Sequence, residues 1–383
     1  MSAESTGTAA AAPTAFVEPP ELRPATFDDF PAMHGLESRF LTNIFSPEDR
    51  RALFEENPLW PRLKDRWTVG WVLEDPDGSI VGAVTNVPSP YVLHGEEKIC
   101  GNGLAWAVTE EHRGYAALLM DEYFEQEQAD FVASSNVGVG ATTIWQAYGT
   151  RVPLGDWGRA AYVVTNRRSF TREVLAMKGI PLAGALSVPA AAGLAVKEGA
   201  TARKLAGPPE GVEIVEARGF DDRFDAFWEE LRAKHADMLL AVRDRATLEW
   251  HYRIPLRAGR LWVYTAERAG SIRAFCVVKE YTRPTGMRSM KIVDYQTVED
   301  AVDLLPGLAR AAAERSADAR LGMLEHNGCD IPKMSGFDDV APYRITKAAW
   351  SFYYRTTDPD LADTLAHPDA WDPSEYDGDT SFM

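Results

Sequence analysis

The sequence predicts an α/β (α+β) protein built from two copies of one domain, each a twisted mixed sheet flanked by helices. Apolar runs of strand length alternate with amphipathic helical stretches, in the order strand, helix, helix, hairpin, strand, helix, strand, helix, strand. That order recurs downstream. Three short sequences are repeated at a nearly constant spacing: Phe27-Asp28-Asp29 as Phe220-Asp221-Asp222, Gly78-Ser79-Ile80 as Gly270-Ser271-Ile272, and Lys98-Ile99 as Lys291-Ile292.

Composition bounds the function. The chain has 383 residues, 45% of them hydrophobic and 25% charged, which suits two globular domains. A net charge of −17 argues against a broad nucleic-acid-binding face. Cys100, Cys276 and Cys329 lie far apart, so we expect no disulfide framework, and a reducing cytoplasm fits. Neither the cysteines nor the histidines show metal-ligand spacing, so no metal is expected, and no apolar run is long enough to span a membrane.

Composition shifts also mark the domain boundaries. We expect a disordered leader (1–20), an N-terminal domain (21–178), a linker rich in Gly, Ala and Pro with a helix in its middle (179–211), a C-terminal domain (212–357) and an acidic tail (358–383).

Local signals define the elements of the first copy. A strand precedes a helix that begins near Asp28, and Ser46 with Pro47 predicts the start of a second helix. Pro76-Asp77-Gly78 reads as the turn of a hairpin. The elements expected after it are a strand (97–108), a helix, a strand (129–137), a helix (141–149) and a last strand of the same sheet (160–166).

The stretch 104–126 carries the clearest functional signal. Residues 104–108 have strand length, Arg113-Gly114 marks a tight turn, and apolar residues then recur on one helical face. A helix N-terminus behind such a turn offers unpaired N–H groups and a positive dipole end. We therefore expect an anion site suited to a pyrophosphate. An ordinary strand-turn-helix without a ligand is the alternative.

This stretch resembles the acyl-CoA turn of the GNAT acyltransferase superfamily. Val108, Glu111, Arg113 and Gly114 match the family pattern, whereas Ala116 and Leu118 depart from it. The resemblance implies acyl-CoA as co-substrate, bound by Ala107, Val108, Thr109, Arg113, Gly114, Tyr115, Ala116 and Ala117. A tandem arrangement is similar to two-domain acyl-CoA N-acyltransferases and, more distantly, to Fem-type aminoacyltransferases, which use aminoacyl-tRNA.

The second copy lacks the Arg-Gly turn. Its helix is expected to begin near Leu304, with Asp303 as cap and Pro306 in the first turn. Four carboxylates precede that helix and would repel a pyrophosphate: Asp294, Glu299, Asp300 and Asp303. The donor is therefore expected in the first copy, and the second copy is either structural or shapes an acceptor pocket.

The resemblance also implies catalytic roles. A backbone N–H near Ala107 and Val108 would polarise the acyl carbonyl. The family's tyrosine acid corresponds here to Trp145, which has no acidic proton and is assigned to the substrate site instead. Tyr148 is the candidate acid, with core packing as its alternative. The candidate bases are Asp294, Glu97 and Glu110, with turn capping or surface positions as alternatives.

The tail has two interpretations. Its segment 358–379 holds eight Asp and Glu and no Lys or Arg, which is typical of a solvated acidic tail. However, it also carries Trp371, Tyr376 and Phe382, which disordered tails rarely contain. On the second interpretation the tail docks between the domains and places Asp377 and Asp379 where they could hold an acceptor ammonium.

Three functions follow from these features. The first is a cytoplasmic N-acyltransferase, monomeric or homodimeric and without a membrane partner, that acts on a small-molecule amine such as an amino sugar or a metabolite. The second is an aminoacyl-tRNA-dependent, Fem-like transferase. Two arginine clusters keep it open despite the acidic charge: Arg151, Arg159, Arg167, Arg168 and Arg172, and Arg243, Arg245, Arg253, Arg257 and Arg260. The third is a non-catalytic binding protein with a degenerate donor site.

Overall fold

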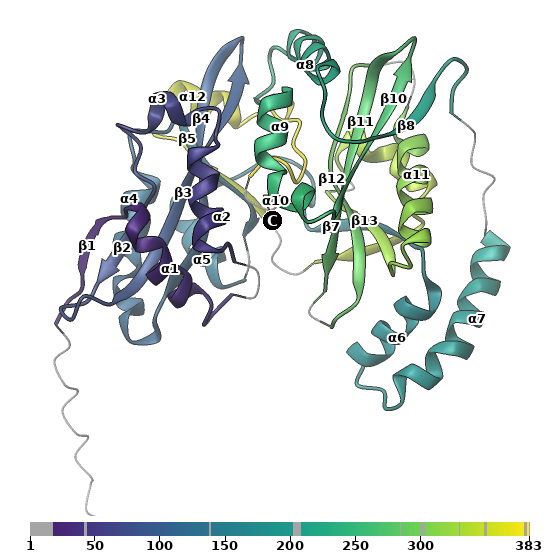
Figure 1. The fold of residues 1–383 in the computed structure, drawn as a ribbon, viewed down its shortest axis with the longest axis horizontal. Coiled ribbons are helices and arrows are strands. Elements are labelled where there is room, and N and C mark those ends of the chain that lie inside the picture. Colours follow the sequence, from purple (N-terminus) through teal and green to yellow (C-terminus); the bar gives the residue numbers. More distant parts are fainter. Residues whose placement is uncertain are drawn as a thin grey trace, which may run out of the picture.

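The computed structural model describes residues 18–41, 44–137, 139–201, 208–283, 285–299, 303–328, 330–347, 351–378 and 381–382. The predicted leader up to residue 17 and three residues singled out above, Asp300, Cys329 and Asp379, lie outside them. Two mixed sheets stand side by side, with α9 and α10 between them and the C-terminus near the middle (Figure 1). In the described part of the chain, no helix has the length and apolarity needed to cross a membrane.

The first sheet is formed mainly by the N-terminal half. Its strands in spatial order are β1 (Glu21–Pro24), β2 (Gly70–Glu74), β3 (Ile80–Leu93), β4 (Glu96–Val108), β5 (Phe131–Val137), β15 (Ser351–Arg355) and β6 (Thr150–Arg151), and β9 (Leu240–Ala241) also pairs with β3. The hairpin from β2 to β3 turns at Pro76-Asp77-Gly78, as predicted.

The second sheet repeats this order. Its strands are β8 (Glu213–Ala217), β10 (Leu261–Arg268), β11 (Ser271–Thr282), β12 (Arg288–Thr297), β13 (Met323–Asn327), β7 (Arg159–Val164) and β14 (Tyr343–Thr346). In each sheet the fourth and fifth strands are parallel and their neighbours antiparallel. The predicted architecture of two GNAT-like domains is therefore confirmed.

The two copies exchange a strand, which the sequence analysis did not predict. The segment 160–166 was expected to close the first sheet, but β7 pairs with β13 and β14 in the second. In return, β15 pairs with β5 and β6 in the first sheet. The prediction was wrong because chain order identifies a strand but not the sheet edge that it completes. The proposed boundaries at 178 and 212 therefore do not separate the two sheets.

Helices cover both faces of each sheet. In the first domain, η1 (Phe27–Asp29), α1 (Phe30–Glu37), α2 (Pro47–Glu55) and α3 (Trp60–Leu63) pack on one face, and η2 (Glu110–Tyr115), α4 (Ala116–Phe124) and α5 (Val139–Tyr148) on the other. Ser46 caps α2 by accepting from the Asp49 N–H, as expected.

In the second domain, α8 (Arg223–Lys234), α9 (Arg245–His251) and α10 (Arg253–Arg257) lie on the side of the first domain, and α11 (Leu305–Asp318) covers the far face (Figure 1). Pro306 lies in the first turn of α11, as predicted, but the N-cap position is Leu304 and not Asp303. Asp303, one residue earlier, accepts from the Leu305 N–H. The remaining helices are α6 (Arg167–Met177), α7 (Ala183–Thr201), η3 (Pro332–Asp339), α12 (Pro359–Leu365) and η4 (Pro368–Ala370).

Candidate active site

The centre of the first domain is a fork between β4 and β5. The two strands pair in parallel at Cys100–Phe131, Gly101–Val132 and Asn102–Ala133, and the ladder ends there. Beyond it β4 runs on to Val108 along β3, and β5 follows β15 instead. The facing edges of β4 and β5 therefore diverge toward the turn that precedes α4.

A bulge bends β4 along this divergent part. Ala83 pairs with Ala107 but Thr85 pairs with Leu104, so β4 holds one extra residue, and Ala105 has a positive φ of 53°. After the bulge, the Thr109 N–H donates to the Val81 carbonyl on β3 at 2.8 Å. Since successive N–H groups of a strand point to opposite edges, the N–H of Val108 points into the fork.

Tyr123 of α4 occupies the closed end of the fork. Its hydroxyl donates to the carbonyl of Gly101 and accepts from the N–H of Gly103, both at 2.9 Å. A Cβ at Gly103 would lie 2.9 Å from the Tyr123 ring, so the glycine is what lets the ring approach the strand. The hydroxyl thereby satisfies backbone groups of β4 at the point where the strands part.

The segment between β4 and α4 is held by a buried histidine that contacts the β2–β3 turn. His112 is buried; its Nδ1 lies 2.8 Å from Thr109 Oγ1 and its Nε2 lies 3.4 Å from Asp75 in the β2–β3 turn. The Arg113 side chain is 65% exposed, and a Cβ on Gly114 would meet no atom within 4 Å. The segment is thus held from the protein side. It is a 3-10 helix rather than the expected tight turn, and the Ala116 N–H behind Gly114 already donates to the Arg113 carbonyl, so the group that could meet an anion is the exposed Arg113 side chain.

The residues predicted for the donor site all lie along this path. Ala107, Val108 and Thr109 end β4, Arg113, Gly114 and Tyr115 belong to η2, and Ala116 and Ala117 begin α4. Leu118, which departs from the family pattern, is 39% exposed. Their binding of a donor stays a prediction.

Tyr148 and Trp145 lie on α5, beside α4. Trp145 is 6% exposed and packs against Tyr123, Phe124 and Tyr353. Tyr148 stacks on Phe124 and donates its hydroxyl to Asp121. That hydrogen bond, with burial and the nearby charge, raises the pKa of Tyr148 to about 12. Its proton is held by a carboxylate, which makes Tyr148 a weak acid at neutral pH.

The candidate bases are not brought together. Glu97 is the second residue of β4, eleven residues before Val108, which places it roughly 35 Å away along the strand. It is exposed and paired with Arg62. Glu110 is 80% exposed and lies 3.8 Å from Arg113. Glu97 and the Val108 N–H therefore cannot act on one carbonyl, because a substrate's reacting atoms lie within a few ångströms of each other.

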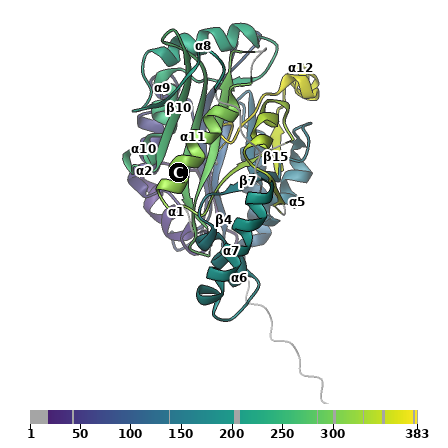
Figure 2. The same ribbon diagram turned by 90° about the vertical axis from the view of Figure 1, so that its right-hand side faces the viewer.

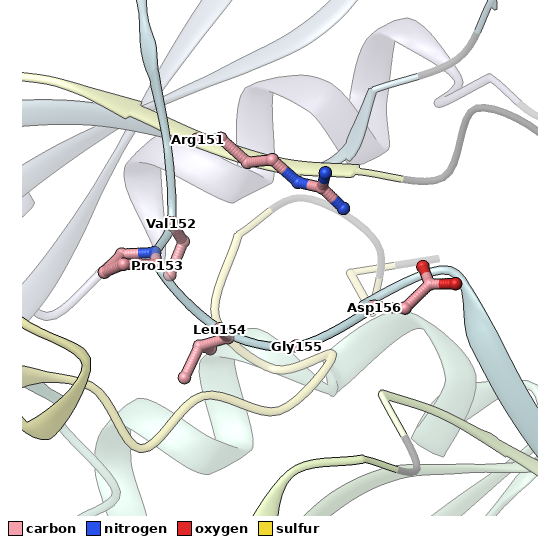
Figure 3. A pocket seen from close by; sticks show the side chains of 6 residues that line it. All are labelled: Arg151, Val152, Pro153, Leu154, Gly155 and Asp156. Atoms are coloured by element: carbon pink, nitrogen blue, oxygen red, sulfur yellow. The ribbon is translucent and has the colours of Figure 1, made fainter.

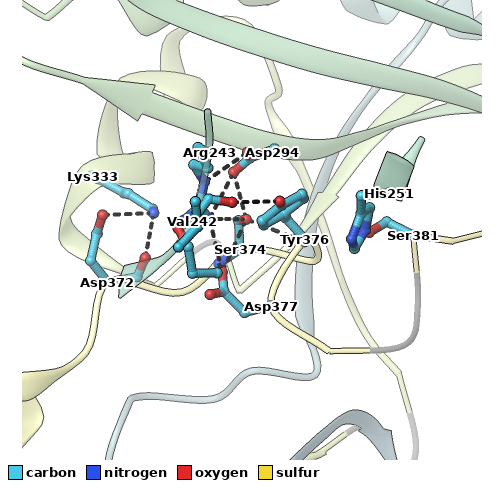
Figure 4. A network of polar contacts seen from close by, with 11 residues as sticks. Val242, Arg243, His251, Asp294, Lys333, Asp372, Ser374, Tyr376, Asp377 and Ser381 are labelled. Atoms are coloured by element: carbon cyan, nitrogen blue, oxygen red, sulfur yellow. Dashed lines mark hydrogen bonds and ion pairs between the residues drawn. The ribbon is translucent and has the colours of Figure 1, made fainter. Parts of the chain in front are cut away.

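Asp294, on β12, belongs to a buried polar network with Arg243, Ser374 and Asp377 (Figure 4). Arg243 donates to it from Nε at 2.9 Å and from Nη2 at 3.2 Å, and the Ser374 hydroxyl donates at 2.6 Å. Asp294 follows a bulge on β12 that matches the bulge of β4. Its oxygens are engaged by a guanidinium and a hydroxyl, so a role as a base would require one of these contacts to open.

The tail docks between the domains, which favours the second interpretation of its sequence. Trp371, Tyr376 and Phe382 are buried. Asp377 accepts from Arg243 at 3.0 Å and from the Ser374 N–H at 2.8 Å. Burial raises the pKa of Asp377, and Arg243 opposes that rise. The carboxylate expected to meet an acceptor ammonium is therefore already paired with a cation of the protein.

Further tail contacts span both sheets. Glu375 pairs with Lys291 of β12 at 2.9 Å, Asp372 with Lys333 at 3.0 Å, and the Ser381 hydroxyl lies 2.5 Å from Nε2 of His251 (Figure 4). On the first-domain side, a Cβ at Gly378 would lie 2.6 Å from Ser135 Oγ on β5. The tail thus contacts β12 of the second sheet and β5 of the first.

Three residues of this region were missed by the sequence analysis. Tyr123 was expected only on an apolar helix face. Its hydrogen bonds to Gly101 and Gly103 of β4 arise only once the helix packs on the folded sheet. Arg243 was placed in the second arginine cluster without a partner, and Ser374 was not singled out. A buried arginine shows no sequence signal unless its partner carboxylates, 51 and 134 positions away, are known.

Four of the five arginines of the second cluster pair with carboxylates. Arg243 is buried with Asp294, and the other pairs place Arg245 with Glu249, Arg253 with Glu56 and Arg257 with Asp49. In the first cluster, Arg159 pairs with Asp330. Paired arginines contribute little to the phosphate contacts on which tRNA affinity rests.

A cavity of about 500 Å³ lies away from the fork, in the crossover from β6 to β7 (Figure 3). Its lining is the loop 151–156, in which only Arg151 and Asp156 carry charge. Within the described residues, no cluster of three or more His, Cys, Asp or Glu side chains is arranged to hold a metal ion. We place the candidate site at the fork because its strand edge, bulge and helix start are continuous.

Similar structures share this architecture. No protein-family profile and no curated protein sequence matches the chain. N-myristoyltransferase of Saccharomyces cerevisiae, solved with bound myristoyl-CoA, aligns with a TM-score of 0.55 at 12% identity over 90% of this chain and 80% of the other.

Two bacterial GCN5-related N-acetyltransferases also align. The protein from Kribbella flavida gives a TM-score of 0.51 at 12% identity, over 88% of this chain and 70% of its own. The protein from Anabaena variabilis gives 0.50 at 9% identity, over 88% and 73%. The chain therefore has the GNAT fold in its tandem form.

Proposed function

We propose that the protein is an N-acyltransferase that moves an acyl group from acyl-CoA to the amine of a small molecule. The observation that carries this proposal is the continuous path from the fork of β4 and β5, past the bulge at Ala105, to the open turn before α4. Such a path offers an extended strand edge to a chain-like carrier and a helix start to its phosphates.

On this proposal the donor lies along β4. Its pyrophosphate lies against the start of η2, with the exposed guanidinium of Arg113 beside it. The thioester carbonyl then accepts from the Val108 N–H, which stabilises the charge that develops on its oxygen. The amine nitrogen forms a bond to the carbonyl carbon, the carbon–sulfur bond breaks, CoA leaves as the thiolate, and the amine gives up a proton.

The acceptor would approach from the face turned toward the second domain. The tail lines this side, with Gly378 against β5 and Asp377 on Arg243. Asp377 would then act through Arg243 and Ser374, by fixing the tail. Asp294 would serve as the base only if its hydrogen bond to Arg243 or Ser374 opened. Tyr148 would serve as the acid only if its hydroxyl no longer donated to Asp121.

Binding and turnover test this function. Acetyl-CoA, longer acyl-CoAs, free CoA and charged tRNA are added separately, and the melting temperature is followed. A ligand at 100 times its dissociation constant stabilises the native state by about 2.7 kcal/mol. Thiol release from the acyl-CoA that binds best is then measured with a panel of amines and amino sugars. Stabilisation by acyl-CoA and amine-dependent thiol release are expected.

Two outcomes would contradict the proposal. Stabilisation by charged tRNA alone, falling with salt, would select the Fem-like alternative. Binding of neither donor would leave the fork as a degenerate site in a binding protein.

A further inference from the structure

The helical hairpin of α6 and α7 exposes an unusual amount of apolar surface. It follows β7 and projects away from the two sheets (Figures 1 and 2). Among the described residues nine large hydrophobic side chains are exposed, and five of them lie between 177 and 196: Met177 (64%), Leu182 (80%), Leu186 (45%), Val188 (53%) and Val196 (75%). So dense a patch on a projecting element is typical of an interaction surface.

The exposed face of α7 is apolar from Leu186 to Val196. Leu186, Pro189, Gly193 and Val196 recur at helical spacing and are all exposed. Residues 181–196 include no charged side chain. The polar residue of this stretch, Ser187, is buried against α6, where its carbonyl accepts from the Thr171 hydroxyl at 3.0 Å. The hairpin thus turns its hydrogen bonds inward and its apolar side chains outward.

The charge around this face is opposite in sign to that of the chain. Between 167 and 196 the sequence has four basic residues and one acid, although the whole chain has a net charge of −17. The acid, Glu173, is buried. The basic side chains are all exposed: Arg167, Arg168, Arg172 and Lys178. Lys178 follows Met177 directly in the turn that leads to Leu182, so charge and apolar surface meet there.

We propose that the α6–α7 hairpin docks the protein on an anionic lipid bilayer. The apolar face of α7 enters the interface while the basic residues of α6 and the turn meet the headgroups. Self-association through the same face is disfavoured, because it would bring two positively charged hairpins together. The protein lies on the membrane in this arrangement without spanning it.

Vesicle co-sedimentation of the full chain tests the proposal. We expect binding to vesicles of phosphatidylcholine mixed with phosphatidylglycerol, at least tenfold tighter than to phosphatidylcholine alone. Leu186→Glu/Val196→Glu should weaken that binding at least tenfold. Arg168→Gln/Arg172→Gln, which leaves the apolar face intact, should weaken it by about fivefold per charge removed. Ile345→Glu is the matched control, because Ile345 is also exposed but lies on β14.

The contrary results are clear. Absence of binding to the anionic vesicles, or full binding by the Leu186→Glu/Val196→Glu variant with an unchanged melting temperature, would overturn the proposal. Light scattering that shows a dimer, converted to a monomer by the same variant, would assign the face to a second copy instead. These measurements use no substrate, so their outcome is independent of the proposed acyl transfer.

Discussion

The guanidinium of Arg243 donates to the carboxylate of Asp377 at 3.0 Å, and both side chains are buried. Arg243 precedes α9 and Asp377 lies in the docked tail, so this pair ties the end of the chain to the second sheet. Asp294 holds the other side of the same guanidinium. Removing one carboxylate would leave the buried cation half neutralised.

We therefore expect Asp377→Ala to destabilise the protein by about 3 kcal/mol, because it breaks a buried ion pair. Urea unfolding measures the loss. Asp369→Ala is the matched control, since Asp369 is exposed and lies on the same tail; it should change stability by less than about 0.5 kcal/mol. Equal stability of the two variants would show that the tail is not fixed by Arg243.

The pH dependence of stability should reflect the titration of the buried Lys279. Burial, and secondarily the charge of Lys291, lowers the pKa of Lys279 from 10.5 to about 7. Between these values the unfolded chain binds more protons than the native state, so the free energy of unfolding rises with pH in that window. The melting temperature should rise from pH 7 to pH 8.5.

Lys279→Met removes this contribution and should flatten the rise. Lys64→Met, at an exposed lysine, is the control and should keep the wild-type slope. A slope unchanged in Lys279→Met would mean that other groups govern the dependence.

Tyr123→Phe tests the closed end of the fork. Without the hydroxyl, the Gly101 carbonyl and the Gly103 N–H lose a partner, which should cost about 1–3 kcal/mol of stability. Because these groups lie where the strands part, we also expect weaker binding of acyl-CoA in calorimetry. A variant that loses stability but binds the donor normally would restrict Tyr123 to a role in the fold.

Val108→Pro tests the backbone donor directly. Proline removes the N–H, and the residue ends β4 with that group pointing away from β3, where proline is tolerated. We expect the rate of acyl transfer to fall by about 10²–10³-fold, the usual effect of losing one oxyanion donor. Donor affinity should change little. An unchanged rate would place the carbonyl elsewhere on the strand.

Arg113→Glu should weaken acyl-CoA binding at least tenfold, because a carboxylate replaces a cation beside the proposed pyrophosphate site. Arg232→Glu makes the same charge change on α8, in the other domain, and is the control. Calorimetry gives both affinities. The same affinity in the two variants would remove Arg113 from the site.

Much of the architecture could be predicted from the chain because its signals are local. The cap of α2, the proline in the first turn of α11 and the turn at Pro76-Asp77-Gly78 each depend on residues within a few positions of one another. The duplication was visible because both copies kept the same element order. Aromatic residues in the acidic tail, such as Tyr376, indicated that it would dock.

The sequence by itself determined the fold class and the duplication, because these depend on periodicity and on neighbours along the chain. Only the tertiary structure decided that β7 and β15 change sheets, that Tyr123 closes the fork, and that Asp294 and Asp377 share Arg243. Those outcomes depend on pairings between residues far apart in sequence, whose energies come from burial and hydrogen bonding in the folded state. A residue's type shows that it needs a partner, but packing selects the partner.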